Sequence, residues 1–452
     1  MKIGIDFGTS YSAAAARIGD RIEHIRFGGQ SQFRTAVFFP TTLPDPADFQ
    51  LTTAMEGEVA DLVRAMKGEQ TRAGIAPRSD AQLHADAVRI VRRQWLEQQM
   101  RDAAASAADL QDAVFGEEAI ERYLEEGTGN LVQSPKSMLG FNLHPRARQT
   151  ITGIAAHILE HIRLSASQQL GTPVREATLG RPVRFRSSMG DAGGEQALSI
   201  LREAAAIAGF DAVQFLEEPA AAALHHHAIS RQRQTTLVVD IGGGTSDIAL
   251  AEIGGDAAPR VHRAWGMPGG GTDVDLALSL AHFMPLFGKG VTRTPVHHFV
   301  EAATVQDMPR QRDFHRRDFR DVEDPYGTRL QALQQDGGTT RLYRGVEDMK
   351  VRLSRHDEAG HVLDYIDPAL QVRTTRGDLE TASARFLGQL GALLDEVRGD
   401  LPRPPDSLFL TGGMSGAPYV QAAARARFPE ARVVLGDPSL GVVSGLAEHA
   451  RN

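Results

Sequence analysis

The feature that most constrains this chain is a strand that delivers a carboxylate into a glycine turn. The apolar residues 237–239 lead to Asp240, and Gly242, Gly243 and Gly244 follow before a second apolar run. Glycine permits positive φ angles and lets backbone N–H groups approach an anion closely. A carboxylate repels a phosphate, so Asp240 is predicted to face a divalent metal or its waters.

The N-terminus repeats this pattern. Residues 3–5 read as an apolar strand, Asp6 follows, and Gly8 opens a turn that carries hydroxyl side chains. One such turn would be weak evidence, because glycine-rich turns are common. Two copies indicate an internal duplication. We therefore expect two lobes, each of which brings one hairpin to a shared cleft.

Two other glycine motifs fail at these positions. A dinucleotide fingerprint needs a third glycine three residues after Gly244, with a helix behind it. Asp247 occupies that position, and residues 248–253 are compatible with a return strand. A P-loop needs Lys-Ser or Lys-Thr after the turn, which is also missing. The residues instead resemble the two phosphate loops of the actin-like ATPase superfamily, which includes sugar kinases, actins and DnaK-type heat-shock chaperones.

Composition sets the outer limits. A chain of 452 residues predicts two or three domains, and 42% apolar with 23% charged residues is typical of globular proteins. The net charge of −8 gives no reason to expect nucleic acid or anionic membrane as partners. The absence of cysteine excludes disulfides and thiol chemistry. Met1 leads almost directly into the first strand, which leaves no room for a signal peptide, and we expect a cytoplasmic protein.

Lys136 stands in an unusual place for a cation. Ser134 is predicted to cap a short helix, and Pro135 suits its first position. Lys136 then lies in the first turn, where the helix dipole is already positive. The simpler interpretation is an exposed lysine. The misplacement, and the resemblance of this segment to a helix start in DnaK-like chaperones, favours a functional lysine.

Three further segments place candidate residues at the start or on one side of a predicted helix. Glu218 lies between a strand at 213–216 and a helix with Pro219 at its first position, which is where open α/β sheets bind ligands. A capping role for Glu218 is the competing interpretation. Thr272 is predicted as the N-cap of the next helix. A helix at 347–354 would place Glu347, Lys350 and Ser354 on one side.

Two segments read as insertions. Residues 55–127 are helical in pattern, with one face predicted from these positions: His84, Ala87, Val88, Val91 and Trp95. Residues 285–341 are polar with weak periodicity. Arg310 to Arg320 interleaves arginine with Phe314 and Phe319, for which a solvated insertion is favoured over nucleic-acid binding. Residues 225–227 are three consecutive histidines on a helix, where side chains diverge, so a metal site is disfavoured.

Together the motifs resemble the nucleotide-binding domain of DnaK-type heat-shock chaperones, and most closely the YegD-like branch that lacks the peptide-binding domain. The resemblance implies an α/β actin-like ATPase fold with two ribonuclease-H-like lobes, whose mixed central sheets are flanked by helices around a nucleotide cleft. Lobe I would span 1–230 with a helical insertion at about 50–130. Lobe II would span 231–436 with an insertion at about 285–345, and residues 437–452 would form a helix that packs back toward lobe I.

The resemblance also assigns site residues, with ATP or ADP and Mg²⁺ as cofactors. Lys136 would be the catalytic lysine near the γ-phosphate, and Glu218 the acid that orders water or metal. Asp6 and Asp240 would lie beside the metal, together with Glu218. The remaining nucleotide-binding residues would be Gly8, Thr9, Ser10, Tyr11, Gly242, Gly243, Gly244, Thr245, Asp247, Gly270, Gly271, Asp273, Glu347, Lys350, Ser354, Gly412, Gly413 and Met414.

The chain departs from the family pattern at several points. Gly416 replaces an arginine that usually lies against the adenine, and Ser439 stands where an acidic residue is usual. Pro182 matches a proline that relays the nucleotide state, and Arg184 and Arg186 are candidates for its partner. No segment corresponds to the peptide-binding domain, its lid or the linker, so the usual client-holding mechanism is not implied.

The expected function is therefore an ATP-binding, slowly ATP-hydrolysing DnaK-like protein whose lobes close on Mg·ATP. Phosphoryl transfer to water needs mainly positioning and charge neutralisation, which this residue set offers. An actin-like bacterial filament protein and a nucleotide-gated interaction module without significant turnover are the alternatives. A sugar or acetate kinase is disfavoured because no acceptor site is visible. The partners would be an adenine nucleotide and a protein client or co-chaperone, with no nucleic acid or membrane, in a monomer or weak oligomer.

Overall fold

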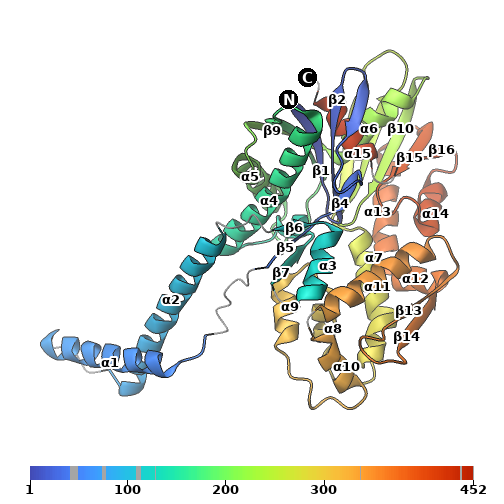
Figure 1. Cartoon of the computed structure of the whole chain (residues 1–452). Coiled ribbons are helices and arrows are strands. Elements are labelled where there is room, and N and C mark those ends of the chain that lie inside the picture. Colours follow the sequence, from blue (N-terminus) through green and yellow to red (C-terminus); the bar gives the residue numbers. More distant parts are fainter. Residues whose placement is uncertain are drawn as a thin grey trace. The chain divides into compact units, whose positions relative to one another are not determined.

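The computed structural model describes residues 1–40, 49–73, 78–107, 113–127, 129–335, 337–437 and 440–450 (Figure 1). The chain forms two compact units. The first comprises Met1–Val37, Phe115–Ile120 and Val132–Asn452, and the second comprises Phe38–Val114 and Glu121–Leu131. The turn predicted at 41–46 and the position of Ser439 lie outside the described residues.

The first unit contains a mixed sheet with the order β3-β2-β1-β8-β9, and β4 also pairs with β2. Strand β1 is antiparallel to β2 and parallel to β8, which is parallel to β9. The strands are β1 (Lys2–Phe7), β2 (Tyr11–Ile18), β3 (Arg21–His24), β4 (Gln32–Arg34), β8 (Glu176–Arg181) and β9 (Ala212–Glu217).

A second mixed sheet in the same unit repeats this topology, with the order β12-β11-β10-β15-β16. Strand β10 is antiparallel to β11 and parallel to β15, which is parallel to β16. The strands are β10 (Gln234–Ile241), β11 (Ser246–Ile253), β12 (Arg260–Met267), β15 (Ser407–Thr411) and β16 (Arg432–Leu435). Each sheet has an aspartate near the end of its first strand: Asp6 on β1 and Asp240 on β10. The repeated topology agrees with the duplicated strand–aspartate–glycine motif.

Helix α15 (Gly441–His449) packs against residues of both sheets. Val443 and Ala447 lie in one apolar cluster with Ala13 and Ala15 of β2. On its other side, the helix approaches α6 (Glu218–Ile229) closely, because a Cβ at Gly445 would collide with the backbone of that helix. The other helices beside the first sheet are α4 (Pro145–Leu170) and α5 (Asp191–Ile207).

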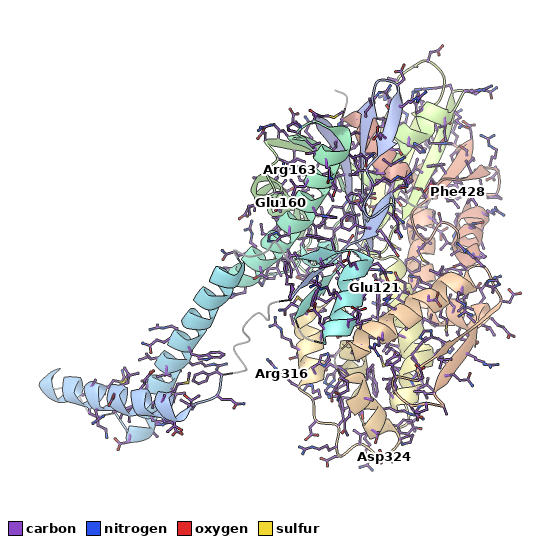
Figure 2. All side chains as sticks on the ribbon, viewed as in Figure 1. Glu121, Glu160, Arg163, Arg316, Asp324 and Phe428 are labelled. Atoms are coloured by element: carbon purple, nitrogen blue, oxygen red, sulfur yellow. The ribbon has the colours of Figure 1, made fainter. Side chains whose placement is uncertain are left out.

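The segment after the second sheet's hairpins is mostly helical and well packed. Its elements are α7 (Gly271–Leu278), a π-helical turn (Ser279–Phe283), a 3₁₀ turn (Met284–Phe287), α8 (Val296–Ala303), α9 (Met308–His315), α10 (Tyr326–Leu333), α11 (Gly338–Leu353), β13 (Glu358–Val362), β14 (Gln371–Thr375), α12 (Arg376–Ala382), α13 (Ala384–Asp400) and α14 (Pro418–Arg427). Phe314 and Phe319 are buried in the core of this segment. Neither ring is available to stack on a nucleic-acid base, while Arg316 extends outward (Figure 2).

The second unit contains α1 (Thr53–Ala73) and α2 (Asp80–Ala107). Val59 of α1 packs against Ala87 and Val91 of α2. The predicted face of α2 is wrong at His84, which is exposed, whereas Leu83 is buried. The boundaries between the two units fall within or beside four elements: β5 (Ala36–Phe39), β6 (Val114–Phe115), α3 (Glu117–Glu126) and β7 (Asn130–Gln133). Within the described ranges, no helix combines the length and apolarity that crossing a bilayer requires.

Candidate functional site

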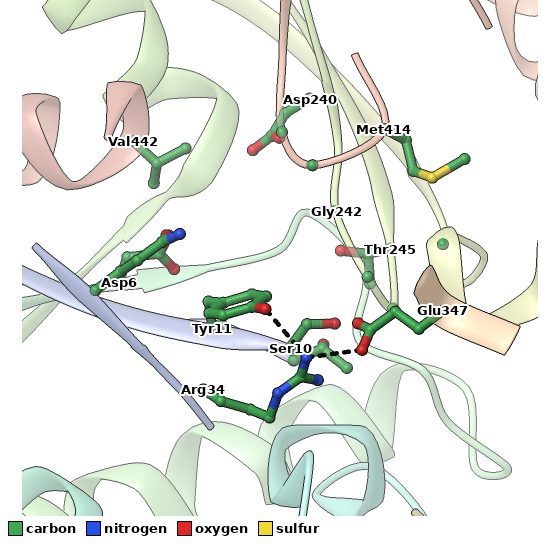
Figure 3. Close-up of a pocket in the computed structure, with 18 of the residues that line it drawn as sticks. Asp6, Ser10, Tyr11, Arg34, Asp240, Gly242, Thr245, Glu347, Met414 and Val442 are labelled. Atoms are coloured by element: carbon green, nitrogen blue, oxygen red, sulfur yellow. Dashed lines mark hydrogen bonds and ion pairs between the residues drawn. The ribbon is translucent and has the colours of Figure 1, made fainter. Parts of the chain in front are cut away.

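A cavity of about 660 Å³ opens in the first unit, where the ends of both sheets meet α11 (Figure 3). Asp6 on β1 and Asp240 on β10 both face this cavity. It brings together most of the residues that the sequence singled out: Asp6, Gly8, Thr9, Ser10, Tyr11, Lys136, Glu218, Asp240, Gly242, Gly243, Gly244, Thr245, Gly271, Glu347, Lys350, Gly412, Gly413 and Met414.

Four predicted site residues do not line the cavity: Asp247, Gly270, Asp273 and Ser354. The Asp247 carboxylate accepts a hydrogen bond of 2.7 Å from the Val183 N–H. Asp273 accepts from the Gly270 N–H at 2.9 Å and pairs with Arg186. The Ser354 hydroxyl donates to the Lys350 carbonyl at 3.2 Å. These residues position the cavity wall.

The turn at Gly270 supports the second glycine turn directly. The Gly271 N–H donates to the Gly242 carbonyl at 2.9 Å, and the Thr272 N–H donates to the Gly243 carbonyl at 2.8 Å. The predicted N-cap at Thr272 is wrong, because Gly270 is the N-cap of α7 and Thr272 lies inside the helix. The Thr272 hydroxyl donates to the Gly243 carbonyl at 2.9 Å instead.

Lys136 is buried, so the interpretation of an exposed lysine is wrong. It lies in a 3₁₀ helix, Pro135–Met138, and only 7% of it is exposed. Ser134 is the N-cap of this helix and Pro135 its first residue, as predicted, but the Ser134 side chain does not form the cap. Ser134 adopts a left-handed φ of 52° at the N-cap position, and its hydroxyl makes no capping hydrogen bond. Lys136 is therefore directed inward, and its Nζ donates to Glu218 Oε1 at 2.6 Å.

Glu218 is the first residue of α6, directly after β9. The N-cap residue of this helix is Glu217, whose side chain makes no cap bond and pairs with Arg181 at 2.7 Å. The carboxylate of Glu218 accepts from Lys136 rather than from the helix N-terminus, which argues against a capping role.

Four carboxylates gather around the single ammonium group of Lys136. Burial and the charge of Glu218 raise the pKa of Asp6 to about 7. Burial and Glu218 also raise the pKa of Asp247 to about 8, and they raise that of Asp240 well above its usual range. Burial opposes the charge of Lys136, but Glu218 and Asp6 outweigh it and raise its pKa. One lysine does not balance this cluster, and oxygen ligands of this kind suit a hard divalent cation.

The two glycine turns approach each other closely at the cavity. A Cβ at Gly243 would collide with the Ser10 hydroxyl, and a Cβ at Gly244 would lie 2.7 Å from Thr9 Oγ1. Only residues without a side chain allow this approach. The turns thus offer closely spaced backbone N–H and hydroxyl groups, which are donors that bind phosphate oxygens.

A network of ion pairs lines the other end of the cavity, and most of its residues were not predicted from the sequence. Arg34 on β4 donates to Glu347 on α11 at 2.7 Å and to the Tyr11 hydroxyl at 3.1 Å (Figure 3). It also donates to Glu117 at 3.0 Å. Arg344 also pairs with Glu117. Burial opposes the charge of Glu347, but Arg34 outweighs it and lowers the pKa of that carboxyl.

Lys350 is held by Asp275, another residue that was not predicted from the sequence. Its Nζ donates to the Asp275 carboxylate at 2.8 Å, and Asp275 is only 2% exposed. Burial raises the pKa of Asp275 to about 6, although Lys350 opposes this rise. Arg344 and Glu347 share a helix face at i and i+3, a weak signal that could have suggested Arg344. The remaining lining residues that the sequence did not indicate are Ala13, Gln32, Asp348, Val351, Arg355, Thr411 and Val442.

Comparisons with known proteins point to one family. A family model described as Hsp70 protein matches residues 102–292. Chaperone protein DnaK 1 of Synechococcus sp. is 28% identical over 281 residues, which cover 60% of this chain and 31% of that protein. Chaperone protein DnaK of Thermosipho africanus is 26% identical over 299 residues, covering 64% of this chain and 41% of the relative. Chaperone protein DnaK of Deinococcus deserti is 23% identical over 435 residues, covering 93% and 54%.

The chain is similar to DnaK chaperones and to the Hsp70 family model over the matched residues, which supports a nucleotide-binding domain of the DnaK/Hsp70 type. The expected actin-like ATPase fold is thereby confirmed, and the two mixed sheets with flanking helices agree with it. The chain spans only about a third to a half of the length of these three relatives.

The metal that an actin-like ATPase fold implies fits the residues present. The carboxylates of Asp6, Glu218 and Asp240 line one cavity, and burial with mutual repulsion raises the pKa values of both aspartates. A divalent cation would relieve that repulsion. Gly416, two residues after the lining residue Met414, does not itself line the cavity; it is exposed, and a Cβ there would have no neighbour within 4 Å. The arginine that the family places against the adenine therefore has no counterpart at this position.

Proposed function

We propose that this chain binds ATP and ADP with Mg²⁺ and hydrolyses ATP slowly, as a switch whose two lobes close on the nucleotide. The observation that carries the proposal is one cavity that combines two closely approaching glycine turns, buried carboxylates and a buried lysine. Each part answers a need of phosphoryl transfer to water, which depends on positioning and on charge neutralisation. The similarity to DnaK chaperones supports the same assignment.

The phosphate end of the cavity would work as follows. Asp6 and Asp240 would hold a hydrated Mg²⁺, which supplies positive charge to the polyphosphate. The turn residues Thr9, Ser10 and Gly242–Thr245 would donate hydrogen bonds to phosphate oxygens. Lys136 would place its ammonium group at the γ-phosphate, and Glu218, which fixes that lysine at 2.6 Å, would also orient the attacking water.

The nucleoside end would use α11 and the turn after β15. Glu347, Lys350 and Ser354 would hold the ribose, and Gly412 to Met414 would close the pocket around the base. Asp275 fixes the Lys350 ammonium at 2.8 Å and so limits the positions that this donor can take. The ion pair between Arg34 and Glu347 would hold the two walls together once a nucleotide has entered.

The finer organisation is part of the proposal. Residues 1–230 and 231–436 would form the two lobes, with insertions at about 50–130 and 285–345, and residues 437–452 would return toward the first lobe. A protein client or co-chaperone would be the further partner. A cytoplasmic location, a monomeric or weakly oligomeric state and a place near the YegD-like branch stay predictions of the sequence.

Calorimetric titration of ATP into the protein, with and without Mg²⁺, tests the proposal. We expect one site with a Kd below about 100 µM that weakens at least tenfold when Mg²⁺ is removed. No binding heat at millimolar ATP would contradict it. ATP-dependent pelleting on ultracentrifugation would favour the filament alternative. Binding without release of phosphate over hours would favour an interaction module without turnover.

A further inference from the structure

Helix α8 gathers two imidazoles and a carboxylate on one side. His297, His298 and Glu301 each have a ligand atom, and these atoms all lie within 4.8 Å of one another. Among the residues that the structure describes, this is the one group of three histidine, aspartate or glutamate side chains with that spacing. The consecutive histidines at 225–227 form no such group, because His226 is turned into the core and stacks on Phe409.

The spacing within the cluster is close to that of a tetrahedral metal site. His298 Nδ1 and Glu301 Oε2 are 3.0 Å apart. Zinc bonds of about 2.0 Å to nitrogen and oxygen place neighbouring ligands about 3.3 Å apart in a tetrahedron. The ring of His297 lies 4.0 Å from that of His298, measured between centroids. His297 is exposed, so its side chain can close the remaining gap by rotation.

Other side chains hold the carboxylate in place. Glu301 is only 8% exposed, and its Oε1 pairs with Arg317 Nη2 at 3.3 Å. Its Oε2 therefore faces His298. Gln311 donates to the Glu301 carbonyl at 2.6 Å, which fixes the end of α8 to α9. Metal-ligating carboxylates are commonly oriented by such second hydrogen bonds, although the charge of Arg317 will limit the affinity for a cation.

We propose that His297, His298 and Glu301 form a binding site for a divalent transition metal, with Zn²⁺ as the best fit. Two imidazole nitrogens and one carboxylate oxygen are ligands that zinc accepts and that Mg²⁺ does not select. The three protein ligands leave one position for water or a ligand from a partner. The site is separate from the nucleotide cavity, because none of its three residues lines that cavity.

Titration of the full chain with Co²⁺ tests the site by its visible spectrum, and Zn²⁺ calorimetry measures the affinity. Both are done with 5 mM Mg²⁺ present, to fill the Mg²⁺ site proposed at Asp6 and Asp240. We expect one equivalent of Co²⁺ with the strong absorption of a four-coordinate nitrogen–oxygen site, displaced by Zn²⁺. The Zn²⁺ Kd should be about 10 µM or lower, as is typical of three-ligand sites without thiolates.

Variants separate this cluster from other histidines. His297→Ala removes an exposed ligand and should fold normally, and His298→Ala removes the central one; each should weaken Zn²⁺ at least tenfold. His262→Ala is the matched control, because His262 lies 3.5 Å from one carboxylate, that of Glu252, and belongs to no group of three. Equal Zn²⁺ affinity in wild type and His297→Ala would overturn the proposal, as would a wild-type Co²⁺ spectrum of the weak octahedral kind. ATP affinity measured on His297→Ala should be unchanged, so the failure of one site does not decide the other.

Discussion

Lys136 Nζ lies 2.6 Å from Glu218 Oε1, and both side chains are buried. The pair brings a residue of the 3₁₀ helix at 135–138 to the first residue of α6, more than eighty positions later. The carboxyl groups of Asp6, Asp240 and Asp247 lie around this pair, so Lys136 has several acidic neighbours besides Glu218. The lysine is thus fixed at one place in a cavity that otherwise favours cations.

Lys136→Ala should remove ATP hydrolysis while it largely spares ATP binding. The ammonium group would act on charge at the γ-phosphate during transfer, whereas the turns and the metal hold the nucleotide. We expect phosphate release to fall at least a hundredfold and the Kd for ATP to change less than fivefold, by calorimetry. A melting curve serves as the control for folding, because the change leaves Glu218 unpaired. Equal phosphate release from both proteins would end the assignment of Lys136.

Asp240→Asn should stabilise the protein without ligands and weaken the effect of Mg·ATP. Burial and neighbouring carboxylates disfavour the ionised form of Asp240, and a neutral amide removes that repulsion. The melting temperature at pH 8 should rise in the absence of nucleotide. The further rise on adding Mg·ATP should be smaller than in wild type. Asp20→Asn, whose side chain is fully exposed, should show neither effect. A full wild-type response to Mg·ATP in Asp240→Asn would remove Asp240 from the metal site.

The sequence predicted for a physical reason that Asp6, Asp240 and the two glycine turns come together at one cavity. A strand, a carboxylate and a glycine turn are contiguous, so local sequence determines where Asp6 and Asp240 point. The contacts of Arg34 with Glu347 and of Asp275 with Lys350 join residues that are 313 and 75 positions apart. No local pattern marks such pairs, and only the folded chain reveals them.

The same limit explains the errors in secondary structure. Helices α8, α9 and α10 have eight residues each, about two turns, which is too short for a periodic pattern to stand out. The N-cap position of Ser134 was predicted correctly from residue type, but the missing side-chain hydrogen bond could not be predicted in that way. The backbone there is left-handed, and the Ser137 N–H and hydroxyl both donate to the Ser134 carbonyl, so the turn does not need the serine side chain.

Arg34→Met should speed the release of nucleotide. Arg34 and Glu347 lie on opposite walls of the cavity, and their side chains are only 12% and 14% exposed. The loss of such a partly buried pair removes one tie between the walls and leaves a carboxylate unpaired. We expect a dissociation rate about tenfold faster, measured by stopped flow with a fluorescent ATP analogue. Arg17→Met breaks a similar pair, with Glu448, outside the cavity, and serves as the control. A similar acceleration in both variants would show that general loosening, not this pair, controls release.

Gly416→Arg should raise the affinity for ATP. Gly416 is exposed, and a side chain there meets no neighbour at its base. A guanidinium group that stacks on the adenine contributes about 0.5–2 kcal/mol, so we expect the Kd to fall by about twofold to thirtyfold by calorimetry. Gly399→Arg, also without close neighbours, adds the same charge away from the cavity and should change nothing. An unchanged Kd in Gly416→Arg would place the base elsewhere.

His226→Leu should protect the protein against acid. His226 stacks on Phe409 with ring centroids 4.1 Å apart, and neither ring nitrogen has a hydrogen-bond partner among the described residues. Burial lowers the pKa of His226 to about 4, from 6.5 in the unfolded chain. Below pH 6.5 the unfolded chain binds the proton first, so stability falls as the pH drops toward 4.

At about 1.4 kcal/mol per pH unit, His226 would account for about 2 kcal/mol of the stability lost between pH 6.5 and pH 5. Urea unfolding at pH 7.5 and pH 5 should show a loss smaller by about that amount in His226→Leu. At pH 7.5 the variant should equal or exceed wild type, because leucine removes two unpaired buried nitrogens. The loss that remains would include His161, which is half-buried and whose pKa burial lowers to about 4. His356→Leu, at an exposed histidine, should lose as much stability between pH 7.5 and pH 5 as wild type. If His226→Leu loses as much stability as wild type, His226 is protonated in the folded protein at pH 5. Its stack on Phe409 would then open in acid.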